Sequence, residues 1–462
     1  MGFDPTRAAT RFGCGLSPRL PAPASVADML QDLTGPDRAA EAFSIPGIDA
    51  AFANERERTV VRKAVRKAKT EAEQDAAKAL QREYRQKVNL DAARWFGHGL
   101  LRRALAEDGF RERLAAFWAD HFTAVGRQGA LRRAQDTYVE EAIRPHLAGR
   151  FPDMLRAVAT HPFMLAYLDQ RLSAGPNSKI VKQGKGRTKG LNENLAREML
   201  ELHTLGVDAP YTQRDVRELA ELLTGLSYNS KNGFMFRPEH AEPGAETVLG
   251  VSYGGQTARL EDIFAALDDL ARHPATAQHI ARKLAVHFVG DSPDPDLVSA
   301  VAARFDATGG DLLQVYEALL THPAAWASTP GNVKQPMDFL GSSLRALDVS
   351  PRHLPLDHQR KMREMFFVPL KLMGQDWGQT PAPDGWPEED PSWITPQRLS
   401  ARMQWAMSVP FRLLRVLPDP RDFVEVALGA GAPETVQFAA RAAETRPEGI
   451  GLVLSSPAFQ RM

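Results

Sequence analysis

The densest group of polar residues that could carry chemistry lies between Asn192 and Gly206. On a helix, Glu198 and Glu201 stand three residues apart on one side, close enough to share a proton or a cation. His203 projects nearly opposite Glu201, so one ion could not easily bind both side chains from this helix alone. The pattern still favours a centre built from carboxylates and histidine.

The same block also has an ordinary structural explanation. Glu193, Arg197 and Glu201 repeat every four residues, a spacing at which opposite charges pair along a helix surface. A histidine in the last turn and a glycine just after it, here His203 and Gly206, are common at helix ends. On this alternative the charges stabilise the helix and perform no chemistry.

A second candidate is the pair Asp120 and His121, which lies inside the aromatic stretch 117–122. A buried histidine held by a carboxylate is a common catalytic or ligand arrangement, although a satisfied core histidine has the same sequence pattern. Asp169, at the end of an apolar helix, and His240 are further polar residues that could converge with this pair.

Tryptophan and proline are concentrated between residues 377 and 405, which we expect to form a stiff aromatic loop. If Trp386 and Trp393 are exposed, they suit a sugar, a peptide or a protein partner. If they are buried, they anchor an irregular segment to the core.

These patterns give three sets of assignments. We predict catalytic roles for Glu198, Glu201, His203, His121 and Asp120. We predict substrate binding by Arg197, Asn192, Asn194, Trp386 and Trp393. With a divalent metal as cofactor, we expect the ligands among Glu198, Glu201, His121, Asp169 and His240.

Several well-defined catalytic motifs are missing from the sequence. Neither His-Glu-x-x-His, typical of zinc proteases, nor Glu-x-x-His, typical of di-iron helical bundles, occurs. Cys14 is the single cysteine, which excludes a CxxC redox pair and an internal disulfide. Residues 250–254 match Gly-x-Ser-x-Gly, but their helical surroundings lack the sheet that a nucleophile elbow needs, so we take the match as accidental.

The charge balance limits the class of partner. The 57 basic and 57 acidic side chains give a formal net charge of zero. Proteins that bind duplexes usually carry a basic excess, so the balance argues against a nucleic-acid partner. No stretch has the pattern of a signal peptide or a membrane span, and we therefore expect a cytoplasmic protein without a membrane helix.

The helices that the periodicity predicts must position the candidate residues. Residues 55–90 carry apolar side chains at helical spacing on a narrow, alanine-rich stripe, which predicts one long helix that forms an arm or one side of a helical hairpin. Helical patterns continue to about residue 172 and resume over 194–205, 213–225 and 260–347.

Two segments break the helical pattern. Residues 173–190 combine glycines with five basic side chains and no acid, which predicts a mobile basic loop. Residues 234–236 and 247–249 have strand-like composition and could pair as one short hairpin. The predicted fold class is therefore all-α: one large multi-helix domain over residues 1–462, with a long projecting helical arm and at most a small β-hairpin.

The chain resembles the bacterial family known as domain of unknown function 1800. The stretches that carry the resemblance extend over nearly the whole chain: 11–18, 117–122, 167–169, 192–206, 211–216, 223–225 and 383–387, together with His240. The block that runs from Asn192 to Gly206 is its most specific part. The resemblance implies no reaction.

The resemblance does imply a partner and a second location. Members often lie beside genes for another family, domain of unknown function 1501, which looks like the sulfatase and alkaline-phosphatase group. Many relatives carry export signals, whereas this sequence starts directly at the family motif. Periplasmic location, through co-export with a signal-bearing partner, is therefore the alternative to the cytoplasm.

Two functional hypotheses follow. In the first, the chain is an enzyme whose carboxylate and histidine side chains surround an inter-helix cleft, with a divalent metal or an acid/base pair, under the 173–190 loop. In the second, it is a non-catalytic helical accessory protein that docks the family-1501 partner through the arm and the tryptophan loop. We favour the enzyme, because the 192–206 block concentrates Asn, Glu, Arg and His beyond what packing needs.

Overall fold

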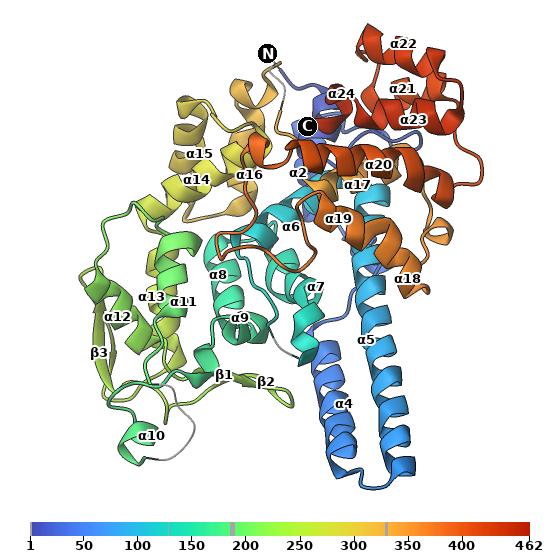
Figure 1. Ribbon diagram of the computed structural model, residues 1–462. Helices are drawn as coiled ribbons and strands as arrows, with labels where there is room; N and C mark the ends of the chain where they lie inside the picture. Colours follow the sequence, from blue (N-terminus) through green and yellow to red (C-terminus); the bar gives the residue numbers. More distant parts are fainter. Residues whose placement is uncertain (1, 128, 185–189, 329–330) are drawn as a thin grey trace.

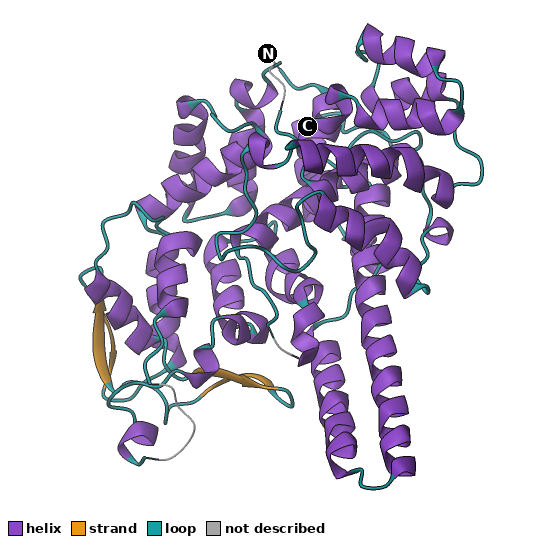
Figure 2. Cartoon of the chain, viewed as in Figure 1, coloured by secondary structure: helices purple, strands orange, loops and turns teal. Residues whose placement is uncertain are grey.

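A computed structural model describes residues 2–127, 129–184, 190–328 and 331–462 of the chain. Helices dominate it, and of its two small two-stranded sheets one lies at the left edge and the other at the lower centre (Figures 1 and 2). The predicted all-α fold class is confirmed. Among the described helices, none combines the length and the apolar character that crossing a bilayer requires.

The first part of the chain builds the arm and the helices around it. Capping side chains set where helices begin: Asp108 accepts from the N–H of Arg111 at the start of α6, and Thr212 forms the expected capping box with Asp215 at the start of α12. The bounds are α1 Pro5–Arg7, α2 Val26–Thr34, α3 Arg38–Ala42, α4 Ile48–Lys67, α5 Glu71–Leu105, α6 Gly109–His121, α7 Gln135–Tyr138, α8 Phe151–Thr160, α9 Pro162–Tyr167, α10 Lys179–Lys182, α11 Asn194–Glu198 and α12 Gln213–Leu222.

The second part continues with helices of similar length, many of which begin with proline in their first turn. The bounds are α13 Leu260–Ala271, α14 Pro274–Phe288, α15 Pro295–Thr308, α16 Leu312–Thr321, α17 Pro336–Ala346, α18 Gln359–Met362, α19 Val368–Leu372, α20 Pro396–Leu413, α21 Pro420–Leu428, α22 Glu434–Ala442, α23 Arg446–Ser455 and α24 Pro457–Gln460. Short π-helical and 3-10 segments join some of them: η1 Ala8–Phe12, η2 Gly129–Arg133, η3 Val139–Ile143, η4 Arg144–His146, η5 Gln170–Leu172, η6 Met199–His203, η7 Pro323–Trp326, η8 Pro351–His353, η9 Arg363–Phe367 and η10 Asp390–Ser392.

The arm is a hairpin of two antiparallel helices, α4 and α5, that projects from the body (Figure 1). The prediction of one long helix over residues 55–90 is therefore wrong. The chain turns at residues 68–70, where Thr70 starts α5 with a capping box: its side chain accepts from the N–H of Glu73, and Glu73 accepts from the N–H of Thr70. An ion pair between Lys87 and Glu57 joins the two helices.

The strand-like segments form two hairpins in place of the single one predicted. Strand β1 (Leu226–Asn229) pairs with β2 (Gly233–Phe236), and β3 (Gly244–Val248) pairs with β4 (Val251–Gly255). Pairing of 234–236 with 247–249 is therefore wrong, because each strand pairs with the neighbour across its own short turn. The Gly-x-Ser-x-Gly match spans the turn of the second hairpin and its strand β4, so it makes no nucleophile elbow.

Buried apolar side chains gather into two separate clusters. One is built mainly from helices α6 to α16, and the other from the C-terminal part of α5 with α17 and the helices after it. Helix α5 thus belongs to the arm at one end and to the second core at the other. Clefts that hold ligands often lie where two such units meet.

The predicted mobile basic loop is described in part. Ala174 binds Gly190 through its backbone, and Gly175 binds the carbonyl of His240, which attaches this end of the loop to the turn after β2. Ser178 is fully buried. Residues 185–189 lie outside the described residues, and the mobility of the loop stays a prediction.

Candidate functional site

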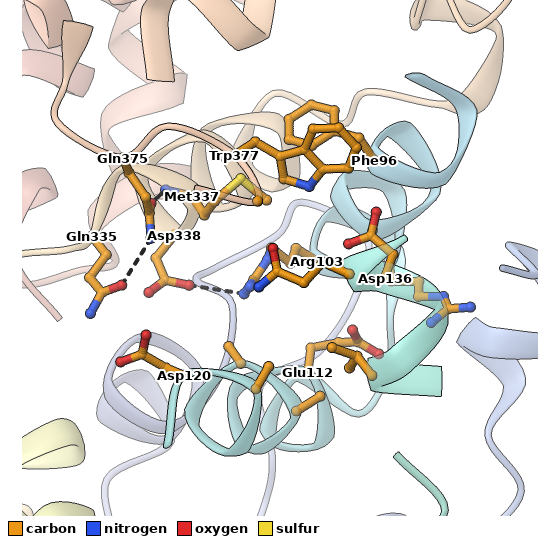
Figure 3. Close-up of a pocket in the computed structure, with 18 of the residues that line it drawn as sticks. Phe96, Arg103, Glu112, Asp120, Asp136, Gln335, Met337, Asp338, Gln375 and Trp377 are labelled. Carbon is orange, nitrogen blue, oxygen red and sulfur yellow. Dashed lines mark hydrogen bonds and ion pairs between the residues drawn. The ribbon is translucent and has the colours of Figure 1, made fainter. Parts of the chain in front are cut away.

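A cavity of about 180 Å³ lies between the two cores, bounded by α5, α6, α7, α14, α17 and the loop after α19 (Figure 3). Its volume is more than ten times what one water molecule needs. Small residues leave room for it: Gly99 on α5 and Ala115, Ala116 and Ala119 on α6 are part of its lining. Its polar lining comprises Arg102, Arg103, Glu112, Asp120, Gln135, Asp136, Glu140, Arg144, His287, Gln335, Asp338 and Gln375, and its aromatic lining comprises Phe96, Trp377 and Trp386.

Asp120, a residue predicted to be catalytic, projects from the end of α6 into this lining. Its Oδ1 accepts a 2.8 Å hydrogen bond from the backbone N–H of Trp386. Burial, and then the negative charge of Glu388, raise the pKa of Asp120 to about 8. The carboxyl group is therefore protonated at neutral pH and can give a proton away.

His287 lines the same cavity from the last turn of α14. Its Nδ1 lies 3.2 Å from each carboxylate oxygen of Glu388. Burial alone would raise the pKa of Glu388, but His287 and Lys283 bring it below its ordinary value, so Glu388 is ionised and only accepts. Nδ1 of His287 therefore donates to Glu388, and Nε2 has no hydrogen-bond partner in the described part of the chain.

Asp136 is a second carboxyl group in the lining, on α7. Burial, and then the charge of Glu140, raise its pKa to about 7, although a hydrogen bond from the side chain of Trp377 opposes this. Its Oδ2 is buried and has no hydrogen-bond partner among the described residues. Figure 3 shows Asp120 and Asp136 on opposite sides of the cavity, with Trp377 and Phe96 above them.

The three guanidinium groups that line the cavity are already neutralised. Arg102 pairs with Glu140, Arg103 with Asp338 at 3.0 Å, and Arg144 with Glu112. Asp338 also binds Arg113 from outside the lining. Asp120 and Asp136 are therefore the two lining carboxyl groups without an ion-pair partner among the residues that the structure describes.

Glu198 and Glu201, two of the predicted catalytic residues, have different surroundings. Arg197 binds Glu201 at 3.0 Å and Glu193 at 3.4 Å, so the charge ladder accounts for Glu201. Glu198 faces no arginine at ion-pair distance in the described chain, and burial, followed by Glu201 and Asp384, raises its pKa to about 7. Neither of them lines the cavity.

His121 and His203 do come together, as predicted, but inside the core. Their ring centres lie 6.3 Å apart, and Nε2 of His121 lies 3.2 Å from the carbonyl oxygen of His203. His279 on α14 is a third member, 6.0 Å from His121. Burial, and then the positive charge of Lys283, lower the pKa of His203 to about 3, so this group is neutral and acts as buried packing.

The remaining predicted site residues take structural positions. Asn192 binds the carbonyl of Leu168 and accepts from the N–H of Asn194, which fixes the start of α11. Asp169 and His240 do not line the cavity. Trp386 lines it, whereas Trp393 is only 1% exposed and donates its indole N–H to the carbonyl of Pro387, so it anchors the loop.

The predicted metal ligands do not assemble. Within the described ranges, no group of three or more His, Cys, Asp or Glu side chains is arranged to hold a metal ion. Arg197 already binds Glu201, and His121 lies among neutral histidines beside the positive charge of Lys283. The described side chains therefore form no cluster that supports the predicted divalent metal.

Sequence reasoning missed His287, Glu388 and Asp136. His287 stands in the last turn of α14, where a histidine is common for purely structural reasons. Glu388 follows the 383–387 turn, a stretch that was singled out without any role for the residue after it. No sequence pattern marks Asp136. Its raised pKa depends on burial, and its hydrogen bond comes from Trp377, which is far away in the sequence.

Comparison with known proteins agrees with the resemblance in the sequence. The family model described as "Protein of unknown function (DUF1800)" matches residues 7–461. No curated protein and no solved structure matches the chain. The arrangement of the cavity therefore has to carry the functional argument.

Proposed function

We propose that this chain, which belongs to the DUF1800 family of proteins of unknown function, is an enzyme whose inter-helix cavity performs acid–base catalysis. One observation carries the proposal: a proton donor and a proton acceptor line the same cavity. The pKa of Asp120 is raised to about 8, and His287 is held by Glu388 through Nδ1 while its Nε2 has no hydrogen-bond partner among the described residues. Two titratable groups in one site are assigned as acid and base when their surroundings shift their pKa values in different directions.

The proposed roles follow from these contacts and from the raised pKa of Asp120. Nε2 of His287 removes a proton from the substrate or from an attacking water, and Glu388 stabilises the imidazolium that forms. Asp120 gives its proton to the departing group, and the hydrogen bond from Trp386 supports the carboxylate that remains. The arrangement fits hydrolysis or elimination, in which one proton is taken and another is given.

Mass spectrometry of a small-molecule extract tests the proposal without a known substrate. Purified protein is incubated with the extract of a bacterial culture, beside Asp120→Asn and His287→Gln. We expect at least one compound to be consumed by the native protein and left intact by both variants. Glu246→Gln is the matched control, since burial also raises the pKa of Glu246 to about 8, outside the cavity. Equal consumption by all four proteins, each shown to be folded, would remove Asp120 and His287 from catalysis.

The accessory-protein hypothesis has one specific observation in its favour. The arm exposes Val60, Val65 and Leu80, with exposed fractions of 62%, 43% and 36%, although apolar side chains usually lie inside. A protein partner would cover them. The family-1501 partner stays a prediction, and co-elution of the two purified proteins in size-exclusion chromatography would test it.

A further inference from the structure

The part of the cavity beneath Trp377 has a composition that indicates what kind of molecule enters it. Five carboxyl groups line the cavity, and its three guanidinium groups pair with three of them. An anionic ligand would find no cation there that is free of a carboxylate. A ligand with a positive charge would meet two carboxyl groups that have no ion-pair partner among the described residues.

From this geometry we infer that the substrate is a small molecule with a primary amine, whose ammonium group binds Asp136 beneath Trp377. The inference rests on the proposed function, because it names the substrate class of the same cavity. Oδ2 of Asp136 is buried without a hydrogen-bond partner in the described chain, and an ammonium group supplies three donors.

The aromatic side chains hold the carboxyl group of Asp136 in place. Trp377 binds the carboxyl group of Asp136 through its side chain, and its ring stacks on Phe367 with ring centres 5.2 Å apart. Phe96 meets Trp377 edge-on at 5.5 Å. A ring held on two sides needs no reordering when the ligand binds.

The opposite side of the cavity then holds the reacting end of the molecule. Asp120 lies across the cavity from Asp136 (Figure 3), so an amine anchored at Asp136 directs its far end toward Asp120. The anchoring residue and the acid thus have separate tasks. When the ammonium group binds, Asp136 loses its proton and becomes a carboxylate. Asp120, on the other side of the cavity, keeps the proton that it donates in the reaction.

Calorimetric titration with simple amines tests the inference. Butylamine and 1,4-diaminobutane serve as probes, with 1-butanol and 1,4-butanediol as uncharged counterparts, in two buffers that contain no primary amine and differ in ionisation enthalpy. We expect the amines to bind at least about tenfold more tightly than the alcohols. At pH 6 binding should release close to one proton from Asp136, and release should vanish well above pH 7, because burial raises the pKa of this carboxyl to about 7.

Variants identify the anchor. Asp136→Asn should lower amine affinity at least about tenfold and abolish proton release, whereas Glu246→Gln should leave both unchanged. Trp377→Phe keeps an aromatic ring but removes the hydrogen bond to Asp136, so it should move the pH dependence of amine binding upward. This second variant keeps the test decisive if Asp136→Asn does not fold.

The outcome separates this inference from the proposed function. Amines that bind no better than the alcohols, or that bind Asp136→Asn and Trp377→Phe as they bind the native protein, would overturn the amine assignment. The extract experiment with Asp120 and His287 variants would stand unaffected. Amine binding at Asp136 without any turnover would support the anchor and count against the acid–base mechanism alone.

Discussion

The backbone N–H of Trp386 donates a 2.8 Å hydrogen bond to Oδ1 of Asp120, which joins two residues 266 positions apart in the sequence. The loop after α19 thereby closes one wall of the cavity and holds the acid in position. This hydrogen bond can form only if the backbone of the loop comes close to the carboxyl group. Gly385, immediately before Trp386, makes that approach.

Gly385→Ala should damage both the fold and the site. Gly385 has φ +94°, and a Cβ there would lie 2.6 Å from Oδ1 of Asp120, so the variant is strained and also displaces the acid. We expect the free energy of unfolding to fall by about 1–3 kcal/mol. Gly250→Ala is the control, because Gly250 has φ +81° but no atom within 4 Å of the added Cβ. Urea titration should show the larger loss for Gly385→Ala; equal losses would mean that the close approach to Asp120 is unimportant.

Asp120→Asn should flatten the pH dependence of stability. The pKa of Asp120 is raised to about 8 in the folded chain, so its contribution to stability is complete below the ordinary carboxyl pKa and is lost as pH rises toward 8. Across that window each pH unit costs the native protein up to about 1.4 kcal/mol through this group. Chemical unfolding at pH 5 and pH 8 should show a smaller difference for Asp120→Asn than for the native protein. An identical difference in both would show that Asp120 ionises freely.

Glu198→Gln and Glu201→Gln should behave differently. Glu201 forms a partly exposed pair with Arg197, and loss of such a pair costs only about 0.3–0.5 kcal/mol at any neutral pH. Glu198 has no such pair, and its pKa is raised to about 7, so Glu198→Gln should be neutral at pH 5 and stabilising at pH 8. Thermal unfolding at the two pH values tests this. A loss of stability in Glu198→Gln at pH 8 would contradict it.

Once a substrate is identified, kcat/KM should fall about tenfold per pH unit above pH 8, because Asp120 loses the proton that it donates. Asp120→Asn should be about 100- to 10,000-fold slower and lack this alkaline limb. Glu246→Gln should retain it, although Glu246 has a similar pKa. A limb that survives in Asp120→Asn would assign the acid role to another group.

Local patterns in the sequence predicted much of the fold and little of the site. Helical periodicity is a property of neighbouring residues, so the all-α class and the charge ladder of Glu193, Arg197 and Glu201 could be derived from spacing. The turn in the arm was missed although Thr70 and Glu73 carry its signal, because an uninterrupted alanine-rich stripe outweighed it.

The site depends on contacts between residues that are far apart in the sequence, which the spacing of neighbouring residues does not reveal. Asp120 was a predicted catalytic residue, but its proton depends on Glu388 and its position on Trp386, both far away in the chain. His287 and Glu388 are separated by 101 positions and meet only after α14 and the loop have packed. The strand pairing failed for a similar reason, since short strands pair by turn geometry and their composition does not select the partner.

Helix α5 connects the arm to the cavity. Its 35 residues run without a break from Glu71 at the tip of the arm to Leu105, a length of about 50 Å at 1.5 Å per residue. Phe96, Arg102 and Arg103, near its inner end, are part of the cavity wall. One continuous helix therefore joins the tip of the arm to the wall of the cavity.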